Sequence, residues 1–324
     1  MTKIITVNNN NYTISLDYIF GFFEGDGSVT IQLKPNPSHK SGKQVVLIFE
    51  IHQHVIDVDL LKAISIYLNC GKVVALRIGR KVGSPDSWVY RLRISTQNDI
   101  INTLLPILQL QSKKMMLKKR QHDIKLFIEA CLIVKDKNHT TIEGQTQIAD
   151  IASNLSSKLS FEDKHYLTET KPTLNSERVT GFVEAEGHFG LSVKFIYDDS
   201  SIPVSSTAIP KVVSSFRFLV VQESSELYSL NLLENFFGCG KTYTRISRPK
   251  ESFYSVTNRK DLVEKIVPFF EKNGLQTIKK HSFLRFKKVL NICEKQKNDN
   301  PLTIQDFNEL NNIISDSTGK RPVK

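Results

Sequence analysis

The chain has 324 residues, 40% hydrophobic and 24% charged, so it can bury a core for two compact domains or for one domain built twice. Lys and Arg outnumber Asp and Glu by 44 to 33, and a formal net charge of +11 attracts polyanions, of which nucleic acid is the commonest. No run of about eighteen apolar residues predicts a transmembrane helix, and the four cysteines, none in a CxxC pair, indicate neither a disulfide framework nor zinc-ligand spacing.

The first elements follow a polar, Asn-rich start that resembles neither a signal peptide nor a transit peptide. We expect a helix over residues 16–24. Residues 28–34 then alternate between polar and apolar, which is typical of a half-buried strand, and residues 45–53 form a second strand. The order continues with a helix at 60–69, strands at 73–77 and 88–95, and helices at 99–108 and 113–134.

The second part of the chain repeats this order. A polar, Ser/Thr-rich connector with a helix at 144–157 precedes it and ends near Lys171-Pro172. The repeat then has a helix at 177–184, strands at 188–194 and 214–222, and a helix at 227–237. Strands at 242–247 and 253–257 and helices at 260–273 and 279–294 complete it, and a tail carries a weaker helical pattern at 303–314.

These patterns predict an α+β fold of two pseudo-symmetric αββαββα half-domains, each with a saddle-like antiparallel sheet. The predicted boundaries are an N-terminal half at 1–136, a linker at 137–176, a C-terminal half at 177–300 and a tail at 301–324.

One motif occurs in both halves. Gly21-Phe22-Phe23-Glu24-Gly25-Asp26-Gly27 aligns position by position with Gly181-Phe182-Val183-Glu184-Ala185-Glu186-Gly187. The pair resembles the two motifs of a double-motif LAGLIDADG homing endonuclease, and the elements after each motif also follow that family's plan over nearly the whole chain.

The spacing within the motif has a physical meaning. Gly21 with Gly25, and Gly181 with Ala185, lie four residues apart on one helix face, so two helix backbones can approach closely there. Each helix then ends beside a pseudo-twofold axis, with its acid next to the acid of the other half. Two unpaired carboxylates so close repel one another, and a divalent cation with hard oxygen ligands, Mg²⁺, relieves that conflict.

The resemblance implies roles for the motif residues. It makes Asp26 and Glu186 the catalytic metal ligands, with help from the backbone carbonyls of Gly25 and Ala185. It makes Glu24 and Glu184 structural residues that cap the helix ends.

Other candidate catalytic residues carry weaker signals. Gln53 and Gln222 align at the ends of the second strands, where the family positions water or metal; strand-end hydrogen bonding is the equal alternative. The family often has a basic residue before the last long helix, and Lys114 and Lys279 are the candidates, against a reading as plain surface lysines.

The strands predict a surface for duplex DNA, since a twisted antiparallel sheet fits along a major groove. A single member of this set is more often a solvated strand residue, but the alternating set favours binding. The candidates are Ser28, Thr30, Gln32, Lys34, Lys72, Arg77, Arg91, Arg93, His188, Ser192, Lys194, Lys241, Tyr243, Arg245 and Arg248.

The resemblance implies a monomeric, Mg²⁺-dependent endonuclease that cuts both strands of a long target, without a membrane partner. It also implies an intron-encoded protein of the mitochondrion, with the chloroplast as an alternative. Two other readings remain open at this point: an RNA maturase that assists splicing of its own intron RNA, and a non-cleaving DNA-binding regulator on the same scaffold. A third reading, an unrelated basic α+β protein with a duplicated domain, does not explain the motif geometry.

Overall fold

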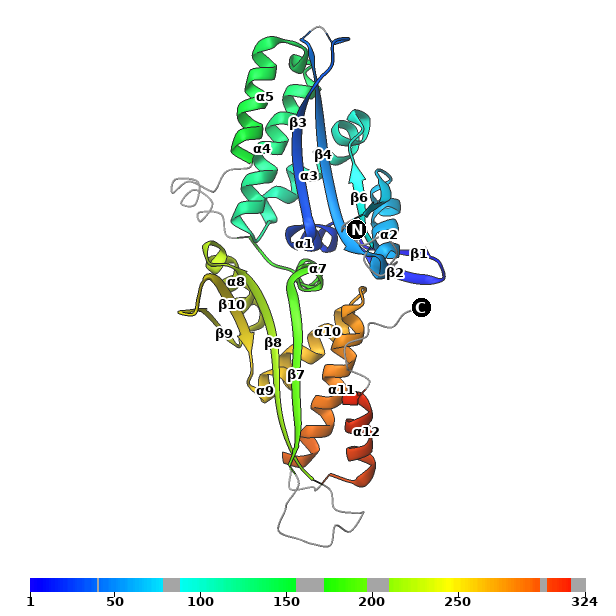
Figure 1. The fold of residues 1–324 in the computed structure, drawn as a ribbon, viewed down its shortest axis with the longest axis vertical. Helices are drawn as coiled ribbons and strands as arrows, with labels where there is room; N and C mark the ends of the chain where they lie inside the picture. Colours follow the sequence, from blue (N-terminus) through cyan, green and yellow to red (C-terminus); the bar gives the residue numbers. More distant parts are fainter. Residues whose placement is uncertain (40, 78–87, 156–171, 197–209, 298–301, 316–324) are drawn as a thin grey trace.

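The computed structural model describes residues 1–39, 41–77, 88–155, 172–196, 210–297 and 302–315. Two halves of the same architecture lie end to end and meet at a pair of helices in the middle (Figure 1). Each half contains a four-stranded antiparallel sheet, in the orders β3-β4-β6-β5 and β7-β8-β10-β9. The predicted fold class is therefore confirmed.

The first half begins with a hairpin and a motif helix. Its elements are β1 (Lys3–Val7), β2 (Asn10–Ile14), α1 (Leu16–Asp26), β3 (Gly27–Pro35), β4 (Lys43–His54), α2 (Val58–Leu68), β5 (Lys72–Arg77), β6 (Trp88–Ile94), a π-helical turn (Asp99–Leu104) that continues into α3 (Leu105–Gln111), and α4 (Lys118–Lys135).

The second half repeats that order after α5 (Ile142–Leu155). Its elements are α7 (Ser176–Glu186), β7 (Gly187–Ile196), β8 (Lys211–Glu223), α8 (Leu227–Phe237), β9 (Lys241–Arg245), β10 (Arg248–Val256), α9 (Arg259–Asp261) with a π-helical turn (Leu262–Ile266), α10 (Val267–Asn273), α11 (Lys279–Lys297) and α12 (Ile304–Ser315). None of the described helices is long and apolar enough to cross a membrane.

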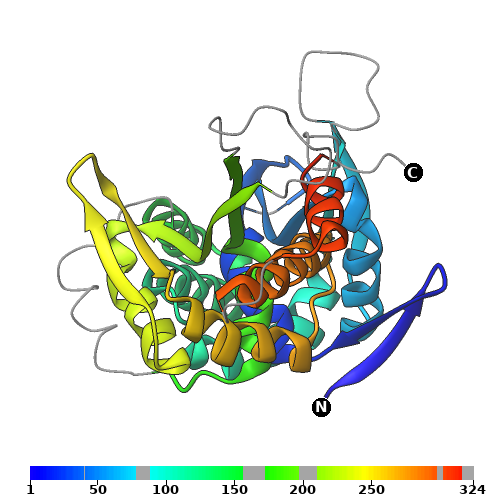
Figure 2. The same ribbon diagram turned by 90° about the horizontal axis from the view of Figure 1, so that it is seen from below.

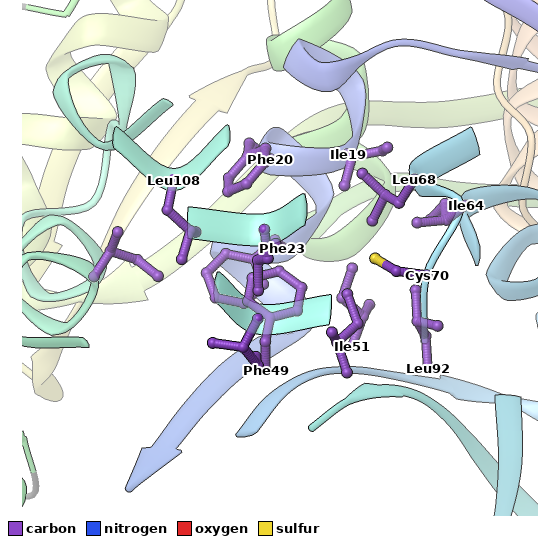
Figure 3. Close-up of a cluster of buried hydrophobic side chains, with 14 of the residues drawn as sticks. Ile19, Phe20, Phe23, Phe49, Ile51, Ile64, Leu68, Cys70, Leu92 and Leu108 are labelled. Carbon is purple, nitrogen blue, oxygen red and sulfur yellow. The ribbon is translucent and has the colours of Figure 1, made fainter. Parts of the chain in front are cut away.

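Each half has its own hydrophobic core between its sheet and its helices. In the first half, the motif helix contributes Phe20 and Phe23, and the Phe23 ring stacks on Phe49 of β4 with 4.4 Å between centroids. Figure 3 shows these side chains with Ile51 and Leu92, which come from the same face of the sheet. The motif helix is thus fixed to the sheet whose other face is free to bind a ligand.

The two halves meet through α1 and α7, which pack side by side in the centre of the molecule (Figure 1). Glycine makes their close approach possible. A Cβ atom on Gly21 would lie 2.0 Å from the backbone oxygen of Arg178, and one on Gly181 would lie 2.2 Å from the backbone oxygen of Tyr18. The small residues spaced four apart in the motif therefore allow the two helix backbones to approach closely, as the sequence indicates.

We predict that Gly21→Ala lowers the free energy of unfolding by about 1–3 kcal/mol, because the added methyl group forces two backbones apart. Chemical denaturation followed by circular dichroism measures this loss. Gly42 is the matched control, because a Cβ atom there meets nothing within 4 Å. Its positive φ of 70° makes Gly42→Asn the suitable control substitution. An equal loss in both variants would contradict the interpretation.

Reciprocal contacts reinforce the contact between halves. The N-cap Ser15 of α1 donates to Glu177 in the first turn of α7 at 2.7 Å, and the N-cap Asn175 of α7 donates to Asp17 in the first turn of α1 at 2.8 Å. These polar contacts orient the two helices, while their small residues allow them to approach.

Acidic side chains also cap the long helices across the interface. Glu226 of the second half accepts hydrogen bonds from the backbone N–H groups of Lys118 and Lys119, at 2.9 and 2.8 Å, at the start of α4. Asp57 of the first half accepts from the backbone N–H of Ile278, just before α11, at 2.8 Å. Each half thus stabilises the N-terminus of a long helix of the other half, where the helix dipole favours anions.

Two elements differ from the sequence expectations, and the helix that was expected in the linker packs on the first half. The hairpin β1–β2 was not predicted; its signal is Asn8-Asn9, both with positive φ, between two β-branched runs. Helix α4 begins at Lys118 and not at 113, because Met115 is extended after a 3-10 turn. Helix α5, which lies inside the expected linker, packs against α4 and β3. The domain boundaries stay a prediction, and residues 156–171 of the linker lie outside the described part.

Candidate active site and DNA interface

The two motif acids come from the adjacent ends of α1 and α7. Asp26 is the last residue of α1 and Glu186 the last of α7. A Cβ atom on Gly25 would lie 3.1 Å from Glu186 Oε1, so the Glu186 carboxylate lies against the end of the neighbouring motif helix. The amide of Gln53 donates to Asp26, and the side chain of Gln222 hydrogen bonds to Glu186. The structure therefore brings these four predicted residues together as two pseudo-symmetric pairs.

The two acids are electrostatically unfavourable as they stand. Burial and the nearby Glu186 carboxylate raise the pKa of Asp26 to about 6, although Lys279, Gln53 and Arg120 oppose the shift. Burial likewise raises the pKa of Glu186, against the effects of Gln222, Lys279 and Arg120. A site that pushes carboxylate pKa values upward is suited to binding a cation, since the cation removes the repulsion.

Of the two basic residues beside the acids, the sequence analysis named only Lys279. Lys279 Nζ donates to the backbone oxygens of Val183 and Ala185, at 3.0 and 3.1 Å. Its pKa is lowered by burial, although the nearby carboxylates oppose that shift. In the first half Arg120 has this position, with Nε 3.1 Å from the backbone oxygen of Glu24. The expected Lys114 lies instead 3.5 Å from Asp17, at the other end of α1.

Arg120 escaped the sequence analysis because it belongs to a run of helix charges that usually marks a solvated face. Its signal was indirect. The two long helices begin at Lys118 and Lys279, so an alignment on helix starts, and not on the preceding Leu-Gln pairs, puts basic residues from the first turn of each helix together.

The sixth motif residues have the structural position that the resemblance implies. Glu24 is fully buried and accepts from the backbone N–H groups of Met116 and Leu117, at 2.6 and 2.8 Å. Arg178, 1% exposed, bridges across from α7 to Glu24 Oε1 at 2.9 Å. In the second half Glu184 accepts in the same way from Thr277 N at 2.8 Å. Tyr18 provides its contact from the opposite helix.

The residues present fit a hard divalent cation. Two carboxylates and the backbone oxygens of Gly25 and Ala185 form an all-oxygen donor set, which Mg²⁺ and Ca²⁺ prefer. Among the described residues, no group of three or more His, Cys, Asp or Glu side chains could hold a metal by itself. A cation at these acids therefore needs further oxygens from water or from the phosphates of a bound ligand.

The raised pKa of Asp26 predicts a pH-dependent stability of the metal-free protein. Because the pKa is about 6 in the folded state and near 3.8 when unfolded, the folded state binds the proton more tightly. The charged carboxylate thus destabilises the fold above pH 6, and this penalty disappears as the pH falls towards 4. We expect Asp26→Asn to unfold at higher denaturant concentration than the wild type at pH 7.5, and the difference to shrink at pH 4.5. A constant difference would contradict the assignment.

The polar face of the first sheet carries most of its predicted DNA-binding residues. Strand register puts Ser28 opposite Glu50, Glu50 opposite Arg93, and Arg93 opposite Lys72, in one row across four strands. Their neighbours along the strands, such as Phe49 and Leu92, point into the core. Thr30, Gln32 and Lys34 continue this face along β3, and Arg91 continues it along β6. Arg77 ends β5 in register with Trp88, five residues after Lys72, so it points to the opposite face of the sheet and not to the predicted one.

The second sheet has an equivalent row of His188, Leu219, Ser255 and Lys241. Ser192 and Lys194 continue it along β7, and both are exposed. Tyr243 stacks on Phe253, with ring centroids 5.5 Å apart, and Arg245 and Arg248 lie in the β9–β10 hairpin. This hairpin projects from one side of the molecule (Figure 2). All the predicted residues except Lys114 thus lie on strands of the two sheets or around the acid pair, where Gly25, Ala185 and Lys279 come from helices α1, α7 and α11.

The fold and the site together define a class of protein: a duplicated α+β protein with a pair of carboxylates at its pseudo-twofold axis. Residues 19–131 and 179–290 each match the model of the LAGLIDADG endonuclease family. The chain belongs to this family.

The relatives agree with that membership. The chain is 25% identical over 305 residues to the probable intron-encoded endonuclease 3 of Neurospora crassa. This alignment covers 91% of this chain and 52% of the relative. It is 24% identical over 314 residues to the probable intron-encoded endonuclease 2 of the same fungus, with 90% and 63% covered. The chain therefore spans between half and two thirds of the length of these two relatives.

Solved structures share the fold. The I-SmaMI LAGLIDADG homing endonuclease bound to cleaved DNA has a TM-score of 0.73 at 22% identity, covering 94% of this chain and 97% of that one. A second structure of I-SmaMI holds its uncleaved DNA target in the presence of calcium ions, with a TM-score of 0.73 at 21% identity and 95% and 100% covered. The LAGLIDADG meganuclease I-CpaMI bound to uncleaved DNA has a TM-score of 0.70 at 21% identity, with 94% and 100% covered.

Proposed function

We propose that the chain is a site-specific homing endonuclease that binds a long duplex DNA target as a monomer and hydrolyses both strands with Mg²⁺. The observation that carries the proposal is the pair of Asp26 and Glu186 at adjacent helix ends, each supported by a glutamine, beside two sheets with polar faces. A duplex has its own twofold symmetry, so a pseudo-dyad presents one acid to each strand.

The site residues divide the chemistry among them. A divalent cation held by the carboxylates would polarise the scissile phosphate and lower the pKa of an attacking water. Gln53 and Gln222 orient the two carboxylates through their hydrogen bonds. Lys279 and Arg120 place fixed positive charge beside the acids, where negative charge builds up on the phosphate in the transition state. Intron encoding in a fungal mitochondrion is part of the same proposal and is supported by the names and organisms of the relatives.

The experiment that tests the function uses a randomised duplex library. The protein is incubated with the library and Mg²⁺, and the cleaved ends are sequenced. The proposal predicts one long target with staggered ends and no cleavage when EDTA replaces Mg²⁺. Binding of a defined duplex without cleavage would favour the regulator. Neither binding nor cleavage of DNA, together with binding of a structured intron RNA, would favour the maturase.

We predict that Arg120→Ala and Lys279→Ala each slow cleavage by about 10²-fold, because each removes a preorganised positive charge from the transition state. Single-turnover cleavage of a labelled duplex, with each strand followed separately, measures the loss. Lys114→Ala is the matched control and should cleave at the wild-type rate, since its ammonium group lies beside Asp17. Slow cleavage by Lys114→Ala together with normal cleavage by Arg120→Ala would contradict the assignment.

A further inference from the structure

A carboxylate lies between two arginines on the face of the first sheet that turns away from the core. Glu50 Oε1 is 3.1 Å from Arg91 Nη1 and 2.9 Å from Arg93 Nη1, and Glu50 Oε2 is 3.5 Å from His52 Nε2. Glu50 is only 8% exposed. We call these four residues the Glu50 cluster. A nearly buried acid in the middle of a surface proposed to bind a polyanion requires an explanation.

The cluster is close to the catalytic acid of its own half. Ser28 pairs with Glu50 across β3 and β4, and it follows Asp26 by two residues. Since a strand rises about 3.3 Å per residue, the cluster lies within a few base-pair steps of the site of cleavage. It therefore faces the part of a bound duplex next to the cut.

Glu50 holds two like charges side by side with a fixed orientation. Both guanidinium groups contact the same carboxylate oxygen through Nη1, and Arg93 Nε reaches Ser95 Oγ at 3.5 Å. Each guanidinium has five N–H donors in a rigid fork, so these contacts leave other donors of each group for a ligand. The side chains of Arg91 and Arg93 are 24% and 27% exposed, and some of their surface is accessible.

This arrangement matches one base pair better than the others. In the major groove, guanine presents two acceptors, N7 and O6, to which an arginine donates in bidentate fashion, and the paired cytosine presents an N4 donor, which a carboxylate accepts. Glu50 is nearly buried and engaged by its own partners, so it can hold an arginine fork in place for the guanine of a G·C pair. An A·T pair offers only one acceptor beside the adenine amino donor on the purine, so the fork is mismatched there.

The second half provides an internal comparison. Strand register puts Leu219 where the first half has Glu50, and Ser255 where it has Arg93. One step along the strands, Val221 and Phe253 replace His52 and Arg91. Leu219 and Phe253 are 9% and 3% exposed, and Tyr243 and Arg245 lie over the Phe253 ring, so this part of the second sheet has no counterpart of the arginine pair held by a carboxylate. The two halves therefore present different side chains at pseudo-equivalent positions.

We propose that the Glu50 cluster determines the preference for G·C in the first half-site, next to the cut. This inference rests on the proposed function. Glu50 is a positioning residue, and Arg91 and Arg93 contact the guanine. The second half lacks this cluster, so the pseudo-equivalent position of its half-site should not show the same dependence on a carboxylate and an arginine pair.

The test is a base-preference profile. The wild-type protein selects a duplex from a randomised library, and every position of that target is then substituted and its binding measured in Ca²⁺. The wild type should prefer G·C over the other pairs by roughly tenfold to a hundredfold at a position beside the cut in one half-site. Arg91→Lys keeps the charge but lacks the fork, and Glu50→Gln releases both arginines. Each should reduce that preference to about threefold or less, with the other positions unchanged.

The matched control is Glu309→Gln, which removes the same charge from an exposed ion pair with Lys288 in the second half. It should leave the profile as in the wild type, and thermal melting verifies that each variant is folded. A wild type that selects no duplex at all would contradict the proposed function itself. A defined target whose G·C preference survives both Arg91→Lys and Glu50→Gln would overturn the inference alone.

Discussion

Asp26→Asn and Glu186→Gln should each abolish double-strand cleavage, with a loss of at least about 10²–10³-fold in rate, while the DNA target is still bound. Each substitution replaces a charged oxygen ligand with a neutral amide of the same shape, so the metal loses the anionic donor that it needs. Each acid belongs to a different half, so we expect residual nicking at the site that keeps its carboxylate. Supercoiled plasmid carrying the target separates nicked from linear product in one gel.

The controls for this experiment come from the motif itself. Asp26→Glu retains the charge and should recover part of the activity, whereas Asp26→Asn should not respond to higher Mg²⁺. Binding is measured in parallel by fluorescence anisotropy in Ca²⁺. Full cleavage by either amide variant would exclude that acid as a metal ligand.

Arg178→Met should lower the free energy of unfolding by about 3–5 kcal/mol, which is a large part of the stability of a domain. The guanidinium is 1% exposed and bridges Glu24 Oε1 at 2.9 Å and Asp17 Oδ1 at 3.2 Å across the helix interface. Its removal leaves a fully buried carboxylate without a counter-ion. The pKa of Glu24 is already raised to about 7 by burial, against the lowering effect of Arg178. The variant should therefore also bind a proton at Glu24 that the wild type releases at pH 8.

Two further variants isolate the buried charge in this prediction. Arg248→Met removes an arginine that is 61% exposed and should cost less than about 1 kcal/mol. The double variant Glu24→Gln with Arg178→Met removes both charges and should be more stable than Arg178→Met alone. Denaturant titrations at pH 8 give all three values. If Arg178→Met lowered the free energy of unfolding no more than Arg248→Met does, the buried ion pair would not contribute to stability.

The sequence predicts most of the fold because the same order of motif, strands and helices occurs in both halves. Residues 28–34 and 188–194 alternate in the same way after the same motif, so each half supports the assignment of the other. Helix 227–237 was predicted with the ends that the structure has. Where only one copy carries a feature, prediction was weaker. Among the described residues, the β1–β2 hairpin has no counterpart before the second motif helix, and its polar, Asn-rich sequence does not indicate two strands.

The candidate site was predictable where local spacing determines position, and less so where tertiary contacts do. Asp26 and Glu186 follow from helix ends, and Gln53 and Gln222 from strand ends. Arg120 does not, because its position beside the acid depends on how α4 crosses the end of α1. The ion pairs of Glu50 join residues 41 and 43 positions apart, and only the strand register reveals them.

The cross-helix contacts of Arg178 with Glu24 and of Tyr18 with Glu184 have an evolutionary consequence. Tyr18 and Arg178 have equivalent positions, three residues before Gly21 and Gly181, and each contacts the buried glutamate of the opposite motif. Each half thus provides a partner for the buried acid of the other half. A gene that lost one half would encode a fragment whose buried glutamate lacks this partner.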